Sequence, residues 1–171
     1  MNTKAWLLCA LALWASACGS GDPKKGGANT DPCTASAKHA TLAIGTSFVD
    51  NTSIAGFVPV DEGGVLELVH GVQGGFHVEI ALRGEHLDNS EVLPGEIRGR
   101  VNGELLANVA PWFQFTCTDE GQDSWGTLLI FRAQPEDLHE QDVEVEVSLI
   151  DASGEEIGAT GTFRIEDPLL R

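Results

Sequence analysis

Hydrophobic and polar residues alternate along much of the chain after residue 40. The clearest stretch runs from residue 143 to residue 149, where each apolar residue is followed by a polar one: Val143, Glu144, Val145, Glu146, Val147, Ser148 and Leu149. Residues 76–83 alternate in the same way. A period of two places successive side chains on opposite faces of a β-strand. The pattern therefore predicts strands with one buried face and one face toward solvent.

Further short segments with strand character recur along the chain. They are Thr41–Phe48, Ser53–Val60, Glu96–Val101, Glu104–Val109, Trp112–Cys117, Gly126–Arg132 and Ile157–Ile165. Asn102-Gly103 separates two of these segments and favours a tight hairpin, because both central positions of a type I′ turn need a positive φ. No segment keeps a helical period over ten residues, and only Pro135–Leu138 suggests a short helical turn. We therefore predict an all-β domain built as an antiparallel two-sheet sandwich, with a jelly roll or barrel as the alternative.

The last part of the chain carries a resemblance to a known fold. The strand pattern from Leu138 to Ile165 resembles the closing strands of immunoglobulin-like or fibronectin-like domains, and this resemblance implies an immunoglobulin-like sandwich. The chain departs from that family because it has no tyrosine and so lacks the tyrosine corner.

The first residues have the pattern of an export signal. Lys4 is followed by an uncharged apolar stretch, residues 5–15, which is shorter than the roughly 20 residues of a membrane-spanning helix. The stretch ends at Ala15-Ser16-Ala17-Cys18, which resembles the lipobox of bacterial lipoproteins, with Ala15 where leucine is commonest. The resemblance implies cleavage before Cys18 and lipid attachment to that cysteine. Ordinary cleavage, with Cys18 left as a free thiol, is the alternative.

These features divide the chain into three parts. Residues 1–17 are the predicted lipoprotein signal peptide, residues 18–32 the lipidated cysteine and a tether, and residues 33–171 the β domain. Residues 19–32 are rich in glycine, proline and polar residues and contain no apolar run, which is typical of a flexible linker. The predicted location is the cell envelope, with the domain anchored to a bacterial membrane at its periplasmic face or outer surface.

Two cysteines remain in the predicted domain, Cys33 and Cys117. An even pair in an oxidising compartment favours a disulfide. Two free buried thiols are the alternative, and a metal site is disfavoured because neither cysteine has a close second cysteine.

The charge of the chain limits its partners. The formal net charge is −16, and loss of residues 1–17 removes one lysine and no acid, which leaves 9 basic and 26 acidic residues and a charge of −17. Such a surface repels nucleic acids and anionic lipid headgroups. We therefore predict no nucleic-acid binding, and contact with the membrane only through the lipid anchor.

Histidines near a glycine-rich turn provide one candidate site. His70 and His77 lie on either side of Gly71–Gly75, and His86 or Glu79 would complete a set of ligands for copper or zinc. Strand alternation opposes this site, because it places His77 on the solvent face with Glu79 and places His70 on the buried face with Leu66 and Leu68. We expect no resident cofactor, and the metal site stands as an alternative.

Other chemistry has weaker support. The predicted loop of residues 118–124 holds three carboxylates, a composition that favours calcium, but their spacing is not that of the helix–loop–helix calcium motif. The sequence has no Gly-x-Ser-x-Gly or His-Glu-x-x-His motif, so we expect no enzyme activity.

A tryptophan provides the remaining candidate. Of the two tryptophans that remain after the predicted cleavage, Trp112 alternates with Phe113 and Phe115. If the two phenylalanines are in the core, Trp112 is exposed and marks a surface for a partner or a carbohydrate. The leading prediction is therefore a membrane-anchored envelope lipoprotein that is a non-enzymatic binding or structural module, with an envelope protein or polysaccharide as partner. A metal-binding lipoprotein is the second possibility and a hydrolase the third.

Overall fold

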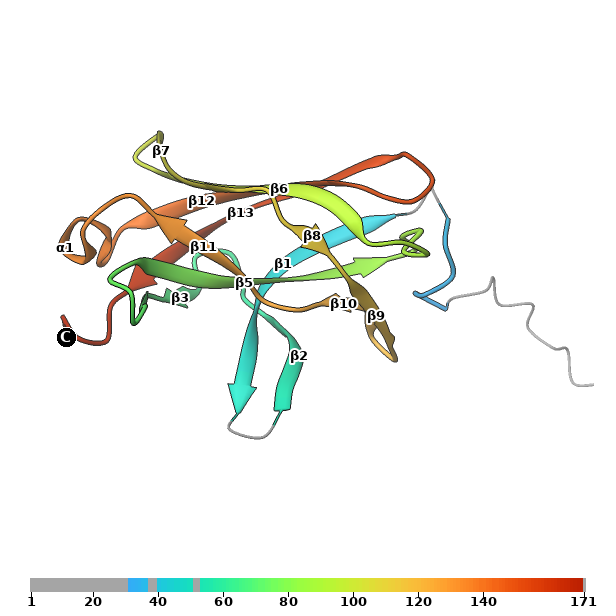
Figure 1. The fold of residues 1–171 in the computed structure, drawn as a ribbon, viewed down its shortest axis with the longest axis horizontal. Coiled ribbons are helices and arrows are strands. Elements are labelled where there is room, and N and C mark those ends of the chain that lie inside the picture. The colour runs from blue at the N-terminus through green and yellow to red at the C-terminus, as the bar shows by residue number, and fades with distance from the viewer. Residues whose placement is uncertain (1–30, 37–39, 51–52, 171) are drawn as a thin grey trace, which may run out of the picture. The chain divides into compact units, whose positions relative to one another are not determined.

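In a computed structural model of the protein, residues 31–36, 40–50 and 53–170 are described (Figure 1). They form thirteen strands and one helical turn, α1 (Pro135–Leu138). The strands are β1 (Thr41–Asp50), β2 (Ser53–Pro59), β3 (Val65–Glu67), β4 (Val69–His70), β5 (Phe76–Glu85), β6 (Leu93–Val101), β7 (Glu104–Val109), β8 (Trp112–Phe113), β9 (Phe115–Thr118), β10 (Gly121–Ser124), β11 (Thr127–Phe131), β12 (Asp142–Ile150) and β13 (Glu156–Glu166). The predicted signal peptide, Cys18 and nearly all of the tether lie outside the described residues.

Hydrogen bonds join the strands into one large open sheet. The main path runs β2-β1-β5-β11-β7-β6-β12-β13-β3, and β4, β8, β9 and β10 attach beside it. The sheet folds over so that β13 lies close to β1 although no ladder joins them (Figure 1). All pairs are antiparallel except β3 with β13, which is parallel. The all-β prediction is confirmed, a purely antiparallel arrangement is wrong, and the immunoglobulin-like arrangement stays a prediction.

The strand alternation predicted from the sequence places the core correctly. On β12, Val143, Val145, Val147 and Leu149 are buried, whereas the residues between them face outward. Val78, Ile80 and Leu82 of β5 are fully buried in the same core. Apolar side chains of the other strands complete one continuous cluster, so hydrophobic burial holds the folded sheet together.

Turn chemistry fixes the hairpins of this sheet. Asn102 and Gly103 both have positive φ, 51° and 81°, as the predicted tight turn between β6 and β7 requires. Between β12 and β13, the buried Asp151 carboxylate accepts hydrogen bonds from the backbone N–H groups of Ser153 and Glu155 at 2.9 and 3.0 Å. Burial acts to raise the pKa of Asp151, but the hydrogen bonds from Ser153, Glu155 and Asp88 lower it overall. The carboxylate is therefore charged at neutral pH and holds the turn.

The segment from residue 112 to residue 124 differs from the sequence prediction. We predicted one strand over Trp112–Cys117 followed by an acidic loop. The structure instead has β8 and then a hairpin of β9 and β10, in which Phe115 pairs with Ser124 and Thr118 with Gly121. All four residues of β10 are buried although three of them are polar. This hairpin positions the candidate site described next.

Candidate functional site

Two exposed tryptophans lie at the base of the β9–β10 hairpin. Trp112 precedes the hairpin and is 71% exposed, and Trp125 follows it and is 57% exposed. Phe113 and Phe115 are buried in the core, so the alternation that predicted an exposed Trp112 holds. The pairing of Phe115 with Ser124 closes the base of the hairpin and brings its two flanks together.

The two indoles border a cleft of about 310 Å³. Its lining comprises both tryptophans together with residues of β8, β10 and β11 and of the connections between strands: Trp112, Phe113, Gln114, Ser124, Trp125, Gly126 and Thr127. None of these residues has a charged side chain. The cleft therefore offers two large apolar surfaces beside neutral amide and hydroxyl groups. We call this group of residues the tryptophan cleft.

The β10 wall of the cleft is held by hydrogen bonds to the neighbouring backbone. The Gln122 amide accepts from the Leu87 N–H and donates to the Leu87 carbonyl, both at 2.9 Å. The Ser124 hydroxyl oxygen accepts from the Leu82 N–H at 3.0 Å. These bonds satisfy polar side chains that would otherwise make burial of β10 unfavourable.

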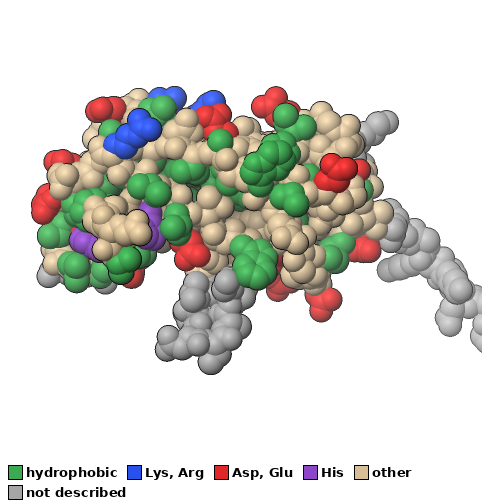
Figure 2. Space-filling model, viewed as in Figure 1, with side chains coloured by type: hydrophobic (Ala, Val, Ile, Leu, Met, Phe, Trp, Pro, Cys, Tyr) green, Lys and Arg blue, Asp and Glu red, His purple; other side chains and the backbone are tan. Residues whose placement is uncertain are grey.

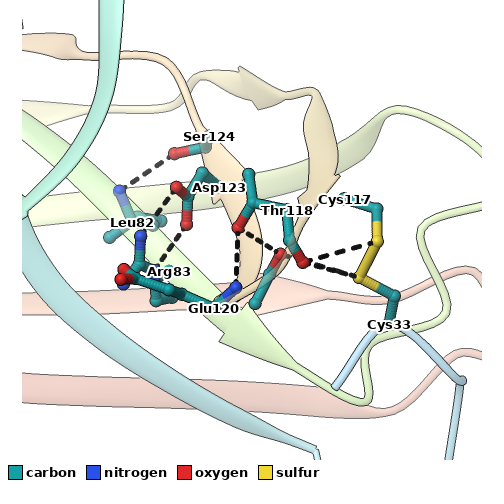
Figure 3. Close-up of polar contacts among 9 residues, drawn as sticks. Cys33, Leu82, Arg83, Cys117, Thr118, Glu120, Asp123 and Ser124 are labelled. Carbon is teal, nitrogen blue, oxygen red and sulfur yellow. Dashed lines mark hydrogen bonds and ion pairs between the residues drawn. A yellow bond between two sulfur atoms is a disulfide. The ribbon is translucent and has the colours of Figure 1, made fainter. Parts of the chain in front are cut away.

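An ion-pair network holds the same hairpin to β5 (Figure 3). The Arg83 guanidinium donates to both carboxylate oxygens of Asp123, at 2.6 and 2.8 Å, and to Glu120 at 2.5 Å. One flat face of the guanidinium lies over the Phe57 ring, with 4.7 Å between the guanidinium carbon and the ring centroid. The hydrogen bond to Asp123 is the largest influence on the pKa of Arg83 and raises it, with a further contribution from Glu120, whereas burial opposes the increase. The guanidinium is therefore permanently charged, and it holds the hairpin through its hydrogen bonds to Asp123 and Glu120.

A disulfide between Cys33 and Cys117 fixes the outer strand of the hairpin (Figure 3). The Cα atoms are 5.8 Å apart, within the usual range for a bridge. This pairing is the one that the cysteine count predicted. It links the start of the described domain to β9, so the bridge restrains the outer strand of the hairpin.

The structure does not bring the predicted metal ligands together. The His70 ring nitrogen Nε2 contacts the buried Asp167 carboxylate at 2.8 Å. The Glu79 carboxylate accepts from the Ser47 hydroxyl, and His86 Nδ1 contacts the Thr34 carbonyl at 2.9 Å. His77 lies on β5 opposite Ile130 and Val69. Within the described ranges no group of three or more potential ligands is placed to hold a metal ion.

The predicted burial of His70 was wrong. Leu66 and Leu68 are buried as expected, but β3 ends at Glu67 and β4 begins at Val69. Because of this break, the burial pattern of β3 does not continue into β4, and both residues of β4 are exposed. Burial acts to raise the pKa of Asp167, but hydrogen bonds from the Leu169 N–H and His70 lower it overall. His70 and Asp167 therefore form a structural pair that ties β4 to the end of the described chain.

The acidic segment of residues 118–124 is part of the β9–β10 hairpin. Two of its carboxylates, Glu120 and Asp123, bind Arg83, and Asp123 is buried against it.

Comparison with known proteins assigns the chain to no family. The chain matches no family model, and searches of curated proteins and of solved structures return no similar protein. In the part of the chain that the structure describes, no helix has the length and hydrophobicity needed to cross a membrane.

Proposed function

We propose that the protein is a cell-envelope lipoprotein whose β domain is a non-enzymatic binding module. Lipid on Cys18 would hold it to a membrane, and residues 19–32 would keep the domain clear of the lipid surface. The Cys33–Cys117 disulfide supports an oxidising compartment outside the cytoplasm. The fold belongs to the same proposal: the layer of β6, β12 and β13 above β5 and β1 in Figure 1 supports an immunoglobulin-like sandwich.

The tryptophan cleft is the observation that carries the binding role. Large aromatic side chains bury much area when they are covered and dominate the energy of many interfaces. Two indoles that are more than half exposed border one cleft. A partner that covers them removes apolar area from water, which makes binding favourable. Figure 2 shows hydrophobic side chains exposed in separate groups on one face of the molecule, with acidic side chains around them. Such acidic surroundings keep the protein soluble while the cleft stays open.

If Cys18 is acylated, the mature chain begins at that residue and its mass includes the acyl chains. Mass spectrometry of protein purified from the native host should show an N-terminus at Cys18 that carries acyl chains. Two or three chains give stable membrane attachment, whereas one chain binds only marginally. A mature N-terminus with an unmodified Cys18 would remove the anchor from the proposal.

Binding through the cleft predicts a tryptophan-dependent association with envelope material. Residues 31–171 form a compact unit of their own, so a chain from Gly19 to Arg171 retains the domain. This chain should sediment with isolated cell envelopes from the native host, and Trp112→Ala should reduce its affinity at least about tenfold, which corresponds to roughly 1.4 kcal/mol.

The matched control for this experiment is Leu105→Ala. Leu105 is another exposed apolar residue, on β7 and outside the cleft lining, so its removal should leave sedimentation unchanged. Equal loss in both variants, or no sedimentation of the wild-type chain, would contradict a binding role for the cleft.

A further inference from the structure

We infer that the tryptophan cleft binds a neutral polysaccharide, with sugar rings stacked on Trp112 and Trp125. This inference rests on the proposed binding function and assigns the chemical class of its ligand. Three properties of the cleft support it: the flat apolar surfaces, the neutral polar groups between them, and the charge of their surroundings.

The two indoles match the shape of a sugar ring. A pyranose has faces made of C–H groups and an edge of hydroxyl groups, so it can cover a flat aromatic surface and still keep its hydroxyls hydrogen-bonded. Trp112 and Trp125 are both more than half exposed and border one cleft of about 310 Å³. Two stacking surfaces beside one cleft suit neighbouring units of a chain better than a single small molecule, which a more enclosed pocket would bury.

The polar groups of the cleft are available to a ligand. Gln114 and Thr127 lie in the lining and make no side-chain hydrogen bond to other described residues. An amide can donate and accept, and a hydroxyl can do both as well. Sugar hydroxyls have the same dual character, so these two side chains can pair with them without a fixed charge on either side.

Charge excludes the acidic polymers. The lining has no charged side chain. Of the carboxylates near it, Asp123 is paired with Arg83, and Glu79, which lies beside Gly126, accepts a hydrogen bond from the Ser47 hydroxyl. The mature chain carries 9 basic and 26 acidic residues after loss of residues 1–17. A polymer of uronic acids or phosphates would approach a negative surface with no cation in the cleft to compensate. A neutral glycan has no such penalty.

The cleft is also fixed before any ligand arrives. Trp112 pairs with Pro94 and Phe113 with Leu93 in the ladder between β8 and β6. On the other side, the hydrogen bonds of Gln122 and Ser124 hold β10. A fixed cleft loses less conformational entropy on binding than a flexible one, which favours affinity from few contacts.

The test uses the only two tryptophans of the chain from Gly19 to Arg171, which are the two in the cleft. Intrinsic fluorescence of this chain therefore reports directly on the site. Titration with cellohexaose, mannohexaose and chitohexaose should change the tryptophan emission with at least one of them. The affinity should be unchanged between about 0.05 and 0.5 M NaCl, because no charge pairing is involved. Trp112→Ala and Trp125→Ala should each weaken binding at least about tenfold, whereas Leu105→Ala should not.

Native envelopes separate the possible outcomes. Digestion of envelope protein with proteinase K should leave sedimentation of the chain intact, and cleavage of glycosidic bonds with anhydrous trifluoromethanesulfonic acid should abolish it. Loss on proteinase K treatment alone would overturn the glycan in favour of a protein partner. A salt-dependent response to hexagalacturonate that exceeds every neutral hexasaccharide would overturn neutrality. In both cases tryptophan-dependent sedimentation with untreated envelopes would persist, so the proposed function would survive. Absence of any sedimentation with untreated envelopes would remove both proposals.

Discussion

Replacement of both Cys33 and Cys117 by serine should lower the free energy of unfolding by about 4.5 kcal/mol. The bridge closes a loop between residues separated by 84 positions, and the chain-entropy model assigns this value to a loop of that length. Without the bridge, the unfolded chain gains conformational freedom that the folded β9–β10 hairpin does not. Urea unfolding monitored by tryptophan fluorescence measures the difference directly.

Reduction of the wild-type chain provides the control for this double variant. Dithiothreitol removes the same bridge without a change of side chain, so both samples should have the same midpoint in urea. A loss below about 1 kcal/mol in both would mean that the hairpin is held by its other contacts and that the bridge contributes little. A large loss only in the serine variant would assign the effect to side-chain packing.

The strand pattern was predictable because burial in this fold follows a period of two over long stretches. On β12, every second residue from Val143 to Leu149 is buried. On β5, Val78, Ile80 and Leu82 are buried as predicted, but Ala81 departs from the alternation because it is buried as well. The turn at Asn102-Gly103 was predictable for a local reason, since both residues tolerate positive φ. Neither signal contains the order of strands, because the pairing of β5 with β11 or of β3 with β13 depends on contacts between distant residues.

The β9–β10 hairpin was missed because its burial depends on partners elsewhere in the chain. Gln122, Asp123 and Ser124 are polar, and such a run ordinarily indicates a solvated loop. Here each finds a partner from residues 82–87: the Leu87 backbone, the Arg83 side chain and the Leu82 N–H. Sequence spacing gives no sign of these contacts, which form only when β5 and β10 lie side by side.

The sequence predicted the exposure of Trp112 but not the position of Trp125 beside it. The alternation around Phe113 and Phe115 indicated that Trp112 faces solvent, and it does. Trp125 follows the segment that we interpreted as a loop, so its place beside Trp112 required the hairpin. The contact of His70 was not predictable for a related reason, because its partner Asp167 lies 97 residues away along the chain.

Replacement of Arg83 by methionine should destabilise the domain by about 3–5 kcal/mol. Its side chain is 18% exposed and that of Asp123 only 8%, so the variant leaves a buried carboxylate without its cation. The double variant Arg83→Met/Asp123→Leu should recover most of this loss, because it removes the buried charge as well. The binding site should respond in parallel, since the same ion pair holds the hairpin that joins the two tryptophans.

Arg164→Met is the matched control for Arg83→Met. Arg164 also pairs with a carboxylate, Asp142, at 3.3 Å, but both side chains are largely exposed. An exposed pair contributes roughly 0–1 kcal/mol, so this variant should unfold in urea almost as the wild type does. If the two arginine variants lose equal stability, burial of the Arg83–Asp123 pair is not what holds the hairpin. If the double variant instead restores stability but not binding to envelopes, Arg83 sets the geometry of the cleft and not only the stability of the fold.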